Sequence, residues 1–381
     1  MPKVRDEEDE EALGGMRNPT KSVERLPKSL ELGTIIRDLF ETGLAKYEVL
    51  KETARAIFEG GKPIPEFDDR IISRLKAATL KVLSFDGLPE KTSLANSPLD
   101  AALLWGWAEF SEDPDGKTLA SWIQKGAPLG FDEAVDCNGV FPKVTGLSPI
   151  DAPTDAELAR PLDGWTNWPS ANEEKDDLHR LVREAEAKGF CRVVTHVREA
   201  KETLGQDPIL NKLGVVVKYS GSGSEVKKKS RIIWDMRESG VNDKCDPAER
   251  IVLPRLMDVV SETLKKQKDN QLPTFAAIDI QDAFHNVPSG ADKKYTAAKV
   301  AMENGEEAFI IYDVLVFGSK SSPTIWGRFA AYLGRILCSV LPEMGVQIYV
   351  DDPIFILPND KEQAVHLLTL TLLILKVSAF L

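Results

Sequence analysis

Apolar residues recur with a helical period through much of the first third of the chain. Within residues 70–83, the apolar positions fall on one face of a helix: Ile71, Ile72, Leu75, Ala78, Val82 and Leu83. Glycine and proline follow at 87 and 89 and end the segment. Residues 31–130 are therefore predicted to be mainly helical. The tryptophans of this region are expected in its core: Trp105, Trp107 and Trp122.

From about residue 171 the pattern alternates between helices and short strands. The expected elements are a helix carrying Leu178–Ala185, strands over Gly214–Tyr219, Lys227–Arg237 and Pro273–Ile280, a helix from Pro323 to Leu341, and short strands over Gln347–Val350 and Ile354–Leu357. Proline suits the first turn of a helix because the N–H that it lacks would have no helical partner there. The segment from 214 to 237 is predicted to form a β-hairpin with a cationic tip.

The amino-acid composition distinguishes two further segments, one at the N-terminus and one after the helical region. The acidic run Asp6–Glu11 lies in a segment without core-forming residues, so residues 1–30 are predicted to be a disordered tail. Residues 131–170 are rich in Pro, Gly and Asp, which is typical of a linker or of an irregular segment that leads into the next unit. Between these segments lies the helical region 31–130, of unknown role, and two further units are expected at 171–270 and 271–381.

The overall charge is acidic, but its distribution is uneven. The 381 residues carry 60 acidic and 48 basic side chains, a net charge of -12. Residues 180–268 reverse this balance, with 19 basic and 13 acidic side chains. A basic stretch beside an acidic cluster is typical of a surface that binds phosphates next to a metal, although a mixed solvated surface would give the same counts.

Cysteine and histidine are too few and too scattered for a disulfide framework or a thiolate zinc site. The four cysteines are Cys137, Cys191, Cys245 and Cys338, and the four histidines are equally dispersed. A reducing compartment is expected, and the charged N-terminus does not resemble a secretory signal. Any bound metal would need carboxylate ligands, which favour hard cations such as Mg²⁺.

Two carboxylate sites follow apolar strands. Asp279 ends the strand over 273–280, and the pair Asp351-Asp352 lies between two short strands. Carboxylates brought together repel one another unless a cation neutralises them, and two cations about 4 Å apart can bind the attacking and leaving oxygens of a phosphoryl transfer. Adjacent acids at a hairpin turn are also often merely solvated, so the pair alone leaves both interpretations open.

The order of four motifs resembles reverse transcriptases. Tyr349-Val-Asp-Asp352 is similar to the YxDD signature of that family, and Asp279-Ile-Gln-Asp-Ala-Phe284 resembles its first carboxylate motif. Phe317–Pro323 resembles the glycine-bearing loop and helix that contact nucleotide and template, and Arg231–Asn242 resembles the fingers segment with its triphosphate-binding arginine. The resemblance covers about residues 170–375 and is closest to retrotransposon-type enzymes.

This resemblance implies roles for individual residues. Asp279, Asp351 and Asp352 would bind two Mg²⁺ ions, or Mn²⁺, with the carbonyl of Ile280 as a further ligand. The incoming triphosphate would be bound by Arg231 and by one of Lys227, Lys228 and Lys229, of which Lys229 is preferred, although a lysine run at a turn is often only solvated. Gly318 would let the backbone approach the base pair, and Phe317 would stack on the nucleotide.

Phe284 lies where the family places an aromatic gate against the ribose 2′-hydroxyl. Its alternative role is that of a core phenylalanine. Pro353 departs from the expected pattern, and we expect it to be tolerated at the start of an edge strand. The stretch Ala364–Leu375 is nearly all apolar, but it is too short and too polar to span a membrane, so it is expected to pack under the catalytic sheet.

The resemblance predicts an α+β fold with fingers over 171–270 and an incomplete palm over 271–381. The palm is expected to be an antiparallel sheet with helices on one face. The function implied is RNA-directed DNA polymerase from a retrotransposon polyprotein, acting in cytoplasm or nucleus on an RNA or DNA template with a primer and deoxynucleoside triphosphates.

The thumb and RNase H motifs of the family are absent from the sequence and are expected on a longer polyprotein. Weak activity and an exposed apolar face on the helix around Leu367 and Leu375 are therefore expected. The alternatives are a non-catalytic remnant that binds nucleic acid and an RNA-synthesising polymerase.

Overall fold

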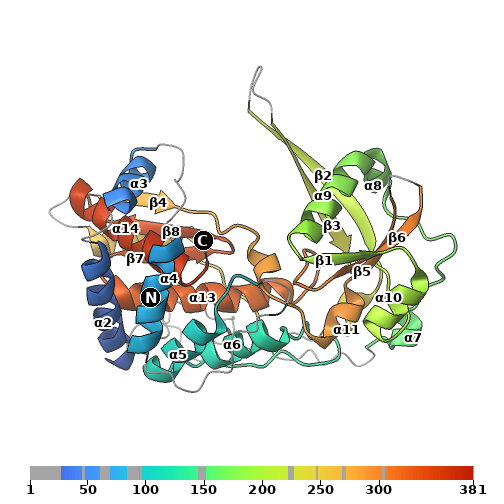
Figure 1. The fold of residues 1–381 in the computed structure, drawn as a ribbon, viewed down its shortest axis with the longest axis horizontal. Helices are drawn as coiled ribbons and strands as arrows, with labels where there is room; N and C mark the ends of the chain where they lie inside the picture. Colours follow the sequence, from blue (N-terminus) through green and yellow to red (C-terminus); the bar gives the residue numbers. More distant parts are fainter. Residues whose placement is uncertain are drawn as a thin grey trace, which may run out of the picture.

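The chain folds into two lobes, which Figure 1 shows side by side. The computed structural model describes residues 27–44, 48–60, 69–83, 94, 97–144, 152–221, 227–245, 248–267, 272–302 and 305–380. The large lobe contains the N-terminal helices and the C-terminal part of the chain, and the small lobe contains most of the middle of the chain. The mixture of helices with antiparallel sheets confirms the α+β class. Of the predicted tail, residues 1–26 lie outside the described ranges.

The large lobe is built from helices around a three-stranded antiparallel sheet. Its helices are α2 (Pro27–Leu44), α3 (Glu48–Phe58), α4 (Asp69–Val82), α5 (Ala101–Ser111), α6 (Gly116–Lys125), α12 (Leu256–Lys266), α13 (Ser322–Val340) and α14 (Lys361–Val377). Its strands are β4 (Thr274–Ala277), β7 (Gly345–Tyr349) and β8 (Asp352–Leu357), in the order β4-β8-β7. The helices predicted over 31–130 and from Pro323 are therefore present.

The proline after the paired aspartates does not lie on an edge strand, as the sequence suggested. β8 is the central strand, and Pro353 pairs with Ile348 of β7. The strand tolerates proline because its carbonyl still accepts a hydrogen bond from the N–H of Ile278 at 3.2 Å, beyond the last ladder residue of β4. The N–H that proline lacks therefore falls where the β4 ladder has already ended.

Helices cover both faces of this sheet. Phe355 and Leu357 point into the main core with α13 and α14, and neighbouring strand residues point the opposite way. On that other face, Gly345 lies so close to α12 that an added Cβ would be 2.8 Å from Cγ of Glu262. Helix α12 lies within residues 171–270, which are predicted to form the fingers, yet it packs against β7 and β8 of this sheet.

The small lobe contains a second three-stranded sheet and a long hairpin. The sheet has the antiparallel order β1 (Cys191–Val194), β6 (Glu307–Tyr312), β5 (Ala297–Ala301), and the hairpin pairs β2 (Lys212–Ser220) with β3 (Lys227–Asp235). The helices are α7 (Asp155–Leu158), α8 (Pro169–Glu173), α9 (Lys175–Ala187), α10 (Val197–Leu204) and α11 (Val241–Lys244). The turns η2 (Ala283–Asn286) and η3 (Ala291–Tyr295) lead back into this lobe. β6 thus pairs with β1 and β5 with β6, so strands from after residue 270 complete the sheet of the small lobe.

The segment expected as a linker at 131–170 is irregular but packed. Phe131, Val135, Val140 and Phe141 are buried, and Leu158 of α7 is also buried. Phe131 lies edge-on to Tyr295, with ring centroids 5.0 Å apart. The described part of this segment therefore contributes to the core rather than connecting two independent domains.

The N-terminal helices dock on α13 through close backbone contacts. A Cβ added to Gly33 of α2 would lie 2.0 Å from the carbonyl oxygen of Ser339, so only glycine fits there. One turn earlier, the hydroxyl of Ser29 hydrogen-bonds that of Ser339 at 2.6 Å. The region 31–130, whose role the sequence left open, therefore forms part of the large lobe.

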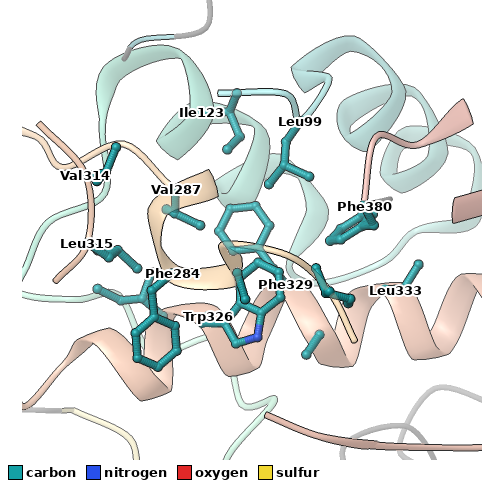
Figure 2. Packing of buried hydrophobic residues seen from close by; sticks show 14 of the residues in the cluster. Leu99, Ile123, Phe284, Val287, Val314, Leu315, Trp326, Phe329, Leu333 and Phe380 are labelled. Carbon is teal, nitrogen blue, oxygen red and sulfur yellow. The ribbon is translucent and has the colours of Figure 1, made fainter. Parts of the chain in front are cut away.

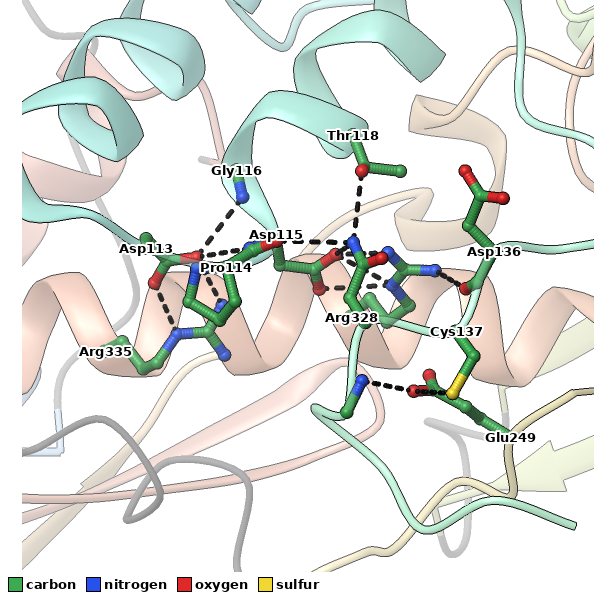
Figure 3. A network of polar contacts seen from close by, with 12 residues as sticks. Asp113, Pro114, Asp115, Gly116, Thr118, Asp136, Cys137, Glu249, Arg328 and Arg335 are labelled. Carbon is green, nitrogen blue, oxygen red and sulfur yellow. Dashed lines mark hydrogen bonds and ion pairs between the residues drawn. The ribbon is translucent and has the colours of Figure 1, made fainter.

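Two buried ion pairs tie the loop between α5 and α6 to α13 (Figure 3). Nε of Arg328 donates to both carboxylate oxygens of Asp115, at 2.9 and 3.1 Å, and its Nη2 also donates to Asp115. Arg335 donates to Asp113 through Nε at 2.7 Å and through Nη2 at 3.0 Å, one bond to each carboxylate oxygen. Arg328 also donates to the carbonyl of Asp136 at 2.6 Å. All four charged side chains are almost fully buried, so each guanidinium requires its carboxylate.

The apolar helix α14 is covered, contrary to the exposed face expected from the sequence. Leu367, Leu368, Leu372 and Leu375 are each at most 1% exposed. The cover comes from α2, α3 and α4, which pack against α14. The helix also contacts β8, as predicted. Within the described ranges, no helix combines the length and apolar character needed to cross a bilayer.

We predict that Asp115→Ala lowers the free energy of unfolding by about 3–5 kcal/mol, because it leaves the guanidinium of Arg328 buried and unpaired. Urea unfolding measures this loss. Glu112→Ala, which removes the exposed pair with Lys28, is the control and should have little effect. The double variant Asp115→Leu/Arg328→Met should recover most of the loss. Equal stability of Asp115→Ala and Glu112→Ala would contradict the role given to this pair.

Candidate active site

Backbone pairing brings the two carboxylate motifs side by side. Asp279 follows the end of β4, and Asp351 lies in the turn between β7 and β8. The N–H of Ile280 donates to the carbonyl of Asp351 at 2.9 Å, so the chain beyond β4 continues alongside this turn. The hairpin predicted around Asp351-Asp352 is therefore present, with the first motif next to it.

A cavity of about 480 Å³ opens at this point between the lobes. Asp279, Ile280 and Asp351 line it on the side of the large lobe, and α9, β3 and Tyr312 line it on the side of the small lobe. Asp352 is the first residue of β8, is exposed, and does not line this cavity. Of the three predicted carboxylates, two thus face the cavity and the third lies beside it.

The electrostatics of the turn favour a bound cation. Burial raises the pKa of Asp351, and the negative charges of Asp352 and Asp279 raise it further, while Arg231 acts in the opposite direction. A raised carboxyl pKa means that the ionised form is disfavoured, and a divalent cation would reverse this.

The carboxylates do not form a ready-made site. Across the ranges that the structure describes, no three His, Cys, Asp or Glu side chains are grouped as metal ligands. The oxygen donors of Asp279 and Asp351 nevertheless suit Mg²⁺, which retains several waters and takes one or two protein carboxylates together with substrate phosphates.

A second acidic residue of the first motif has a different partner. Asp282 also lines the cavity, but its carboxylate accepts a hydrogen bond from Nζ of Lys188 at 2.5 Å. Lys188 in turn lies over the ring of Phe190, 5.5 Å from its centroid. The negative charge of Asp282 is therefore already compensated.

Basic side chains of β3 form the opposite wall. Lys229 and Arg231 line the cavity, and they share one face of the strand because alternate residues point the same way. Lys228 points to the other face, where Nζ contacts Glu174 at 2.7 Å and Asp177 at 2.8 Å. These contacts raise the pKa of Lys228. The structure thus separates the preferred Lys229 from its neighbour Lys228.

The glycine-bearing loop approaches the backbone of β3. Gly318 has a φ of +116°, and an added Cβ would lie 2.1 Å from the carbonyl oxygen of Trp234. Its own carbonyl accepts a hydrogen bond from Nδ2 of Asn242 at 2.8 Å, and Oδ1 of Asn242 accepts one from the N–H of Lys320 at 2.9 Å. Glycine is required here by the packing of the protein itself, a reason that the sequence analysis did not find.

The two phenylalanines predicted to contact the nucleotide lie together but differ in exposure. Phe317 is 43% exposed and lines the cavity, whereas Phe284 is 7% exposed and lies behind it. Their ring centroids are 4.8 Å apart. Figure 2 shows Phe284 within the buried apolar cluster, near Leu315 and Trp326. Phe317 is therefore the exposed member of this aromatic pair, and Phe284 packs against it from the core side.

Three aromatic residues of the cavity were not found by the sequence analysis. His285 packs against Phe190 and Tyr312, with ring centroids 4.9 and 5.7 Å apart, and edge-on against Phe317 at 5.6 Å. Burial lowers the pKa of His285 to about 4, so its ring is neutral at neutral pH. Phe190 and Tyr312 belong to segments without a recognisable motif. For His285, the only sign of a place in the cavity was its position next to Phe284 in the sequence.

The comparisons with known proteins agree with this geometry. Residues 226–380 match the family model described as reverse transcriptase (RNA-dependent DNA polymerase). The matched range includes both carboxylate motifs, the glycine-bearing loop and β3. No curated protein matches the chain. Residues 226–380 therefore form a reverse transcriptase domain.

Proposed function

We propose that this chain is an RNA-directed DNA polymerase domain of retrotransposon type, which adds deoxynucleotides to a primer on an RNA or DNA template. The observation that carries the proposal is the cavity in which Asp279 and Asp351 face Lys229 and Arg231. Carboxylates on one wall and fixed positive charges on the other match a metal-bound triphosphate.

The side chains on the two sides of the cavity have different roles in the proposed reaction. Asp279 and Asp351, with Asp352 beside them and the carbonyl of Ile280, would hold two Mg²⁺ or Mn²⁺ ions. When bound, these cations supply charge neutralisation for the attacking 3′-oxygen and the departing diphosphate. Lys229 and Arg231 bind and orient the phosphates through charge-assisted hydrogen bonds. Phe317, supported by Phe284, provides an apolar surface for the sugar and base.

We place this activity inside the cell, in cytoplasm or nucleus. The four cysteines, all within the described residues, form no disulfide bond: Cys137, Cys191, Cys245 and Cys338. Burial and nearby negative charges raise the pKa of the Cys191 thiol, which keeps it protonated and unreactive. Reduced thiols of this kind are typical of proteins in a reducing compartment.

We predict that Asp351→Asn weakens Mn²⁺ binding at least about tenfold and abolishes primer extension on an RNA template, because it removes a ligand charge from the cavity. Isothermal titration with Mn²⁺ measures the affinity. Asp282→Asn is the matched control, since that carboxylate lines the same cavity but is already paired with Lys188. If Asp351→Asn binds Mn²⁺ like the wild type and primer extension is undetectable in both, the proposed catalytic role is contradicted, and the alternative of a non-catalytic remnant is favoured.

We predict that Lys229→Ala raises the KM for deoxynucleoside triphosphate about tenfold, because one charge-assisted phosphate contact is lost. Lys228→Ala is adjacent but faces Glu174 and Asp177, so its KM should stay near that of the wild type. Steady-state kinetics on a primed homopolymer template provide both values. The opposite order of the two variants would show that β3 presents its other face to substrate.

We predict that Phe284→Val raises the use of ribonucleotides relative to deoxynucleotides, because Phe317 loses its support and the space beneath the sugar opens. The measurement is the ratio of kcat/KM for the two nucleotides. Phe309→Val, at a similarly buried position in the apolar cluster of the small lobe, controls for general loosening. An unchanged ratio would assign Phe284 to the core alone. A wild type that already prefers ribonucleotides would indicate an RNA-synthesising polymerase.

A further inference from the structure

The turn that carries Asp351 contains a strained residue. Val350 has a φ of +58°, in the left-handed region. A β-branched side chain is disfavoured there because Cβ approaches the following carbonyl oxygen. Such a conformation persists only where surrounding contacts hold it, and it is found at functional sites more often than elsewhere.

A buried tryptophan holds the carbonyl of this residue. Nε1 of Trp326, in α13, donates to the carbonyl oxygen of Val350 at 2.7 Å. The indole is 0% exposed and packs against Phe329 and Phe380, with ring centroids 6.3 Å from each (Figure 2). Because water cannot reach the indole N–H, its hydrogen bond to the turn has no solvent substitute.

The other side of the turn is held as well. The carbonyl of Asp351 accepts the hydrogen bond from Ile280, at 2.9 Å. Val350 packs against the main apolar core, and with Ile251 and Gly327 it lines a small residual space of about 20 Å³. These two hydrogen bonds hold the backbone of the turn at Val350 and Asp351, next to the segment that carries Asp279.

We propose that Trp326 is a positioning residue, which stabilises the left-handed conformation of Val350 and thereby aims the carboxylate of Asp351 into the cavity. This inference rests on the proposed metal-binding role of Asp351. It assigns to the indole N–H a task that phenylalanine, which is also a planar aromatic residue but is smaller, cannot perform, because phenylalanine has no donor.

The test is a double-mutant cycle of Trp326→Phe with Val350→Gly. Glycine adopts positive φ without cost, so the turn no longer needs the hydrogen bond when residue 350 is glycine. In the valine background, Trp326→Phe should speed hydrogen exchange of the Ile280 amide about fivefold and weaken Mn²⁺ binding by a similar factor. In the glycine background, both effects should nearly vanish.

The control is Trp107→Phe, at a buried position of α5. It should leave exchange at Ile280 and Mn²⁺ affinity unchanged, even where it lowers the melting temperature. Equal effects of Trp326→Phe in both backgrounds, or exchange that rises throughout the protein, would overturn the proposal and leave Trp326 as a core residue. Failure of the metal-binding proposal is distinguishable, because Asp351→Asn would then bind Mn²⁺ as tightly as the wild type while the exchange effect persisted.

Discussion

The fold depends on two buried ion pairs, because a buried guanidinium group is stable only when it is paired with a carboxylate. Helix α13 buries both Arg328 and Arg335, and their partners, Asp113 and Asp115, come from the loop between α5 and α6. Unpaired, either charge would cost several kcal/mol, so α13 reaches its native environment only when the N-terminal helices have docked. The same helix begins directly after the glycine-bearing loop and carries Trp326. The N-terminal region therefore stabilises the reverse transcriptase domain through its ion pairs with α13.

Acidic and basic side chains line the same cavity of the candidate site. Mutual repulsion and burial disfavour ionisation of Asp351, and Lys229 with Arg231 forms a cationic wall across the cavity. In the proposed function, a metal-bound triphosphate would bring cations to the carboxylates and phosphate charges to Lys229 and Arg231. Neighbouring charges that take no part, on Lys228 and Asp282, are paired within the protein. This separation between paired and unpaired groups defines the site more clearly than the motifs alone.

Local patterns in the sequence were sufficient for the parts of the site that lie within one segment. The hairpin around Asp351, the strand before Asp279 and the helix after Ser321 follow from apolar runs and turn residues, and the family match confirms the resemblance. Contacts between distant segments could not be predicted. Arg328 and Asp115 are 213 positions apart, the cover of α14 comes from helices near the N-terminus, and the aromatic cluster draws on three segments. Charge, burial and shape are complementary only in three dimensions, and a single sequence carries no record of such pairs.

The central claim is that one cavity holds both the cations and the triphosphate. Anomalous diffraction from crystals grown with Mn²⁺, a template–primer duplex and a non-hydrolysable deoxynucleotide would test it most directly. The account predicts manganese peaks beside the carboxylates of Asp279 and Asp351, with the triphosphate against Lys229 and Arg231. A nucleotide bound elsewhere, or manganese peaks only at carboxylates outside this cavity, would contradict it.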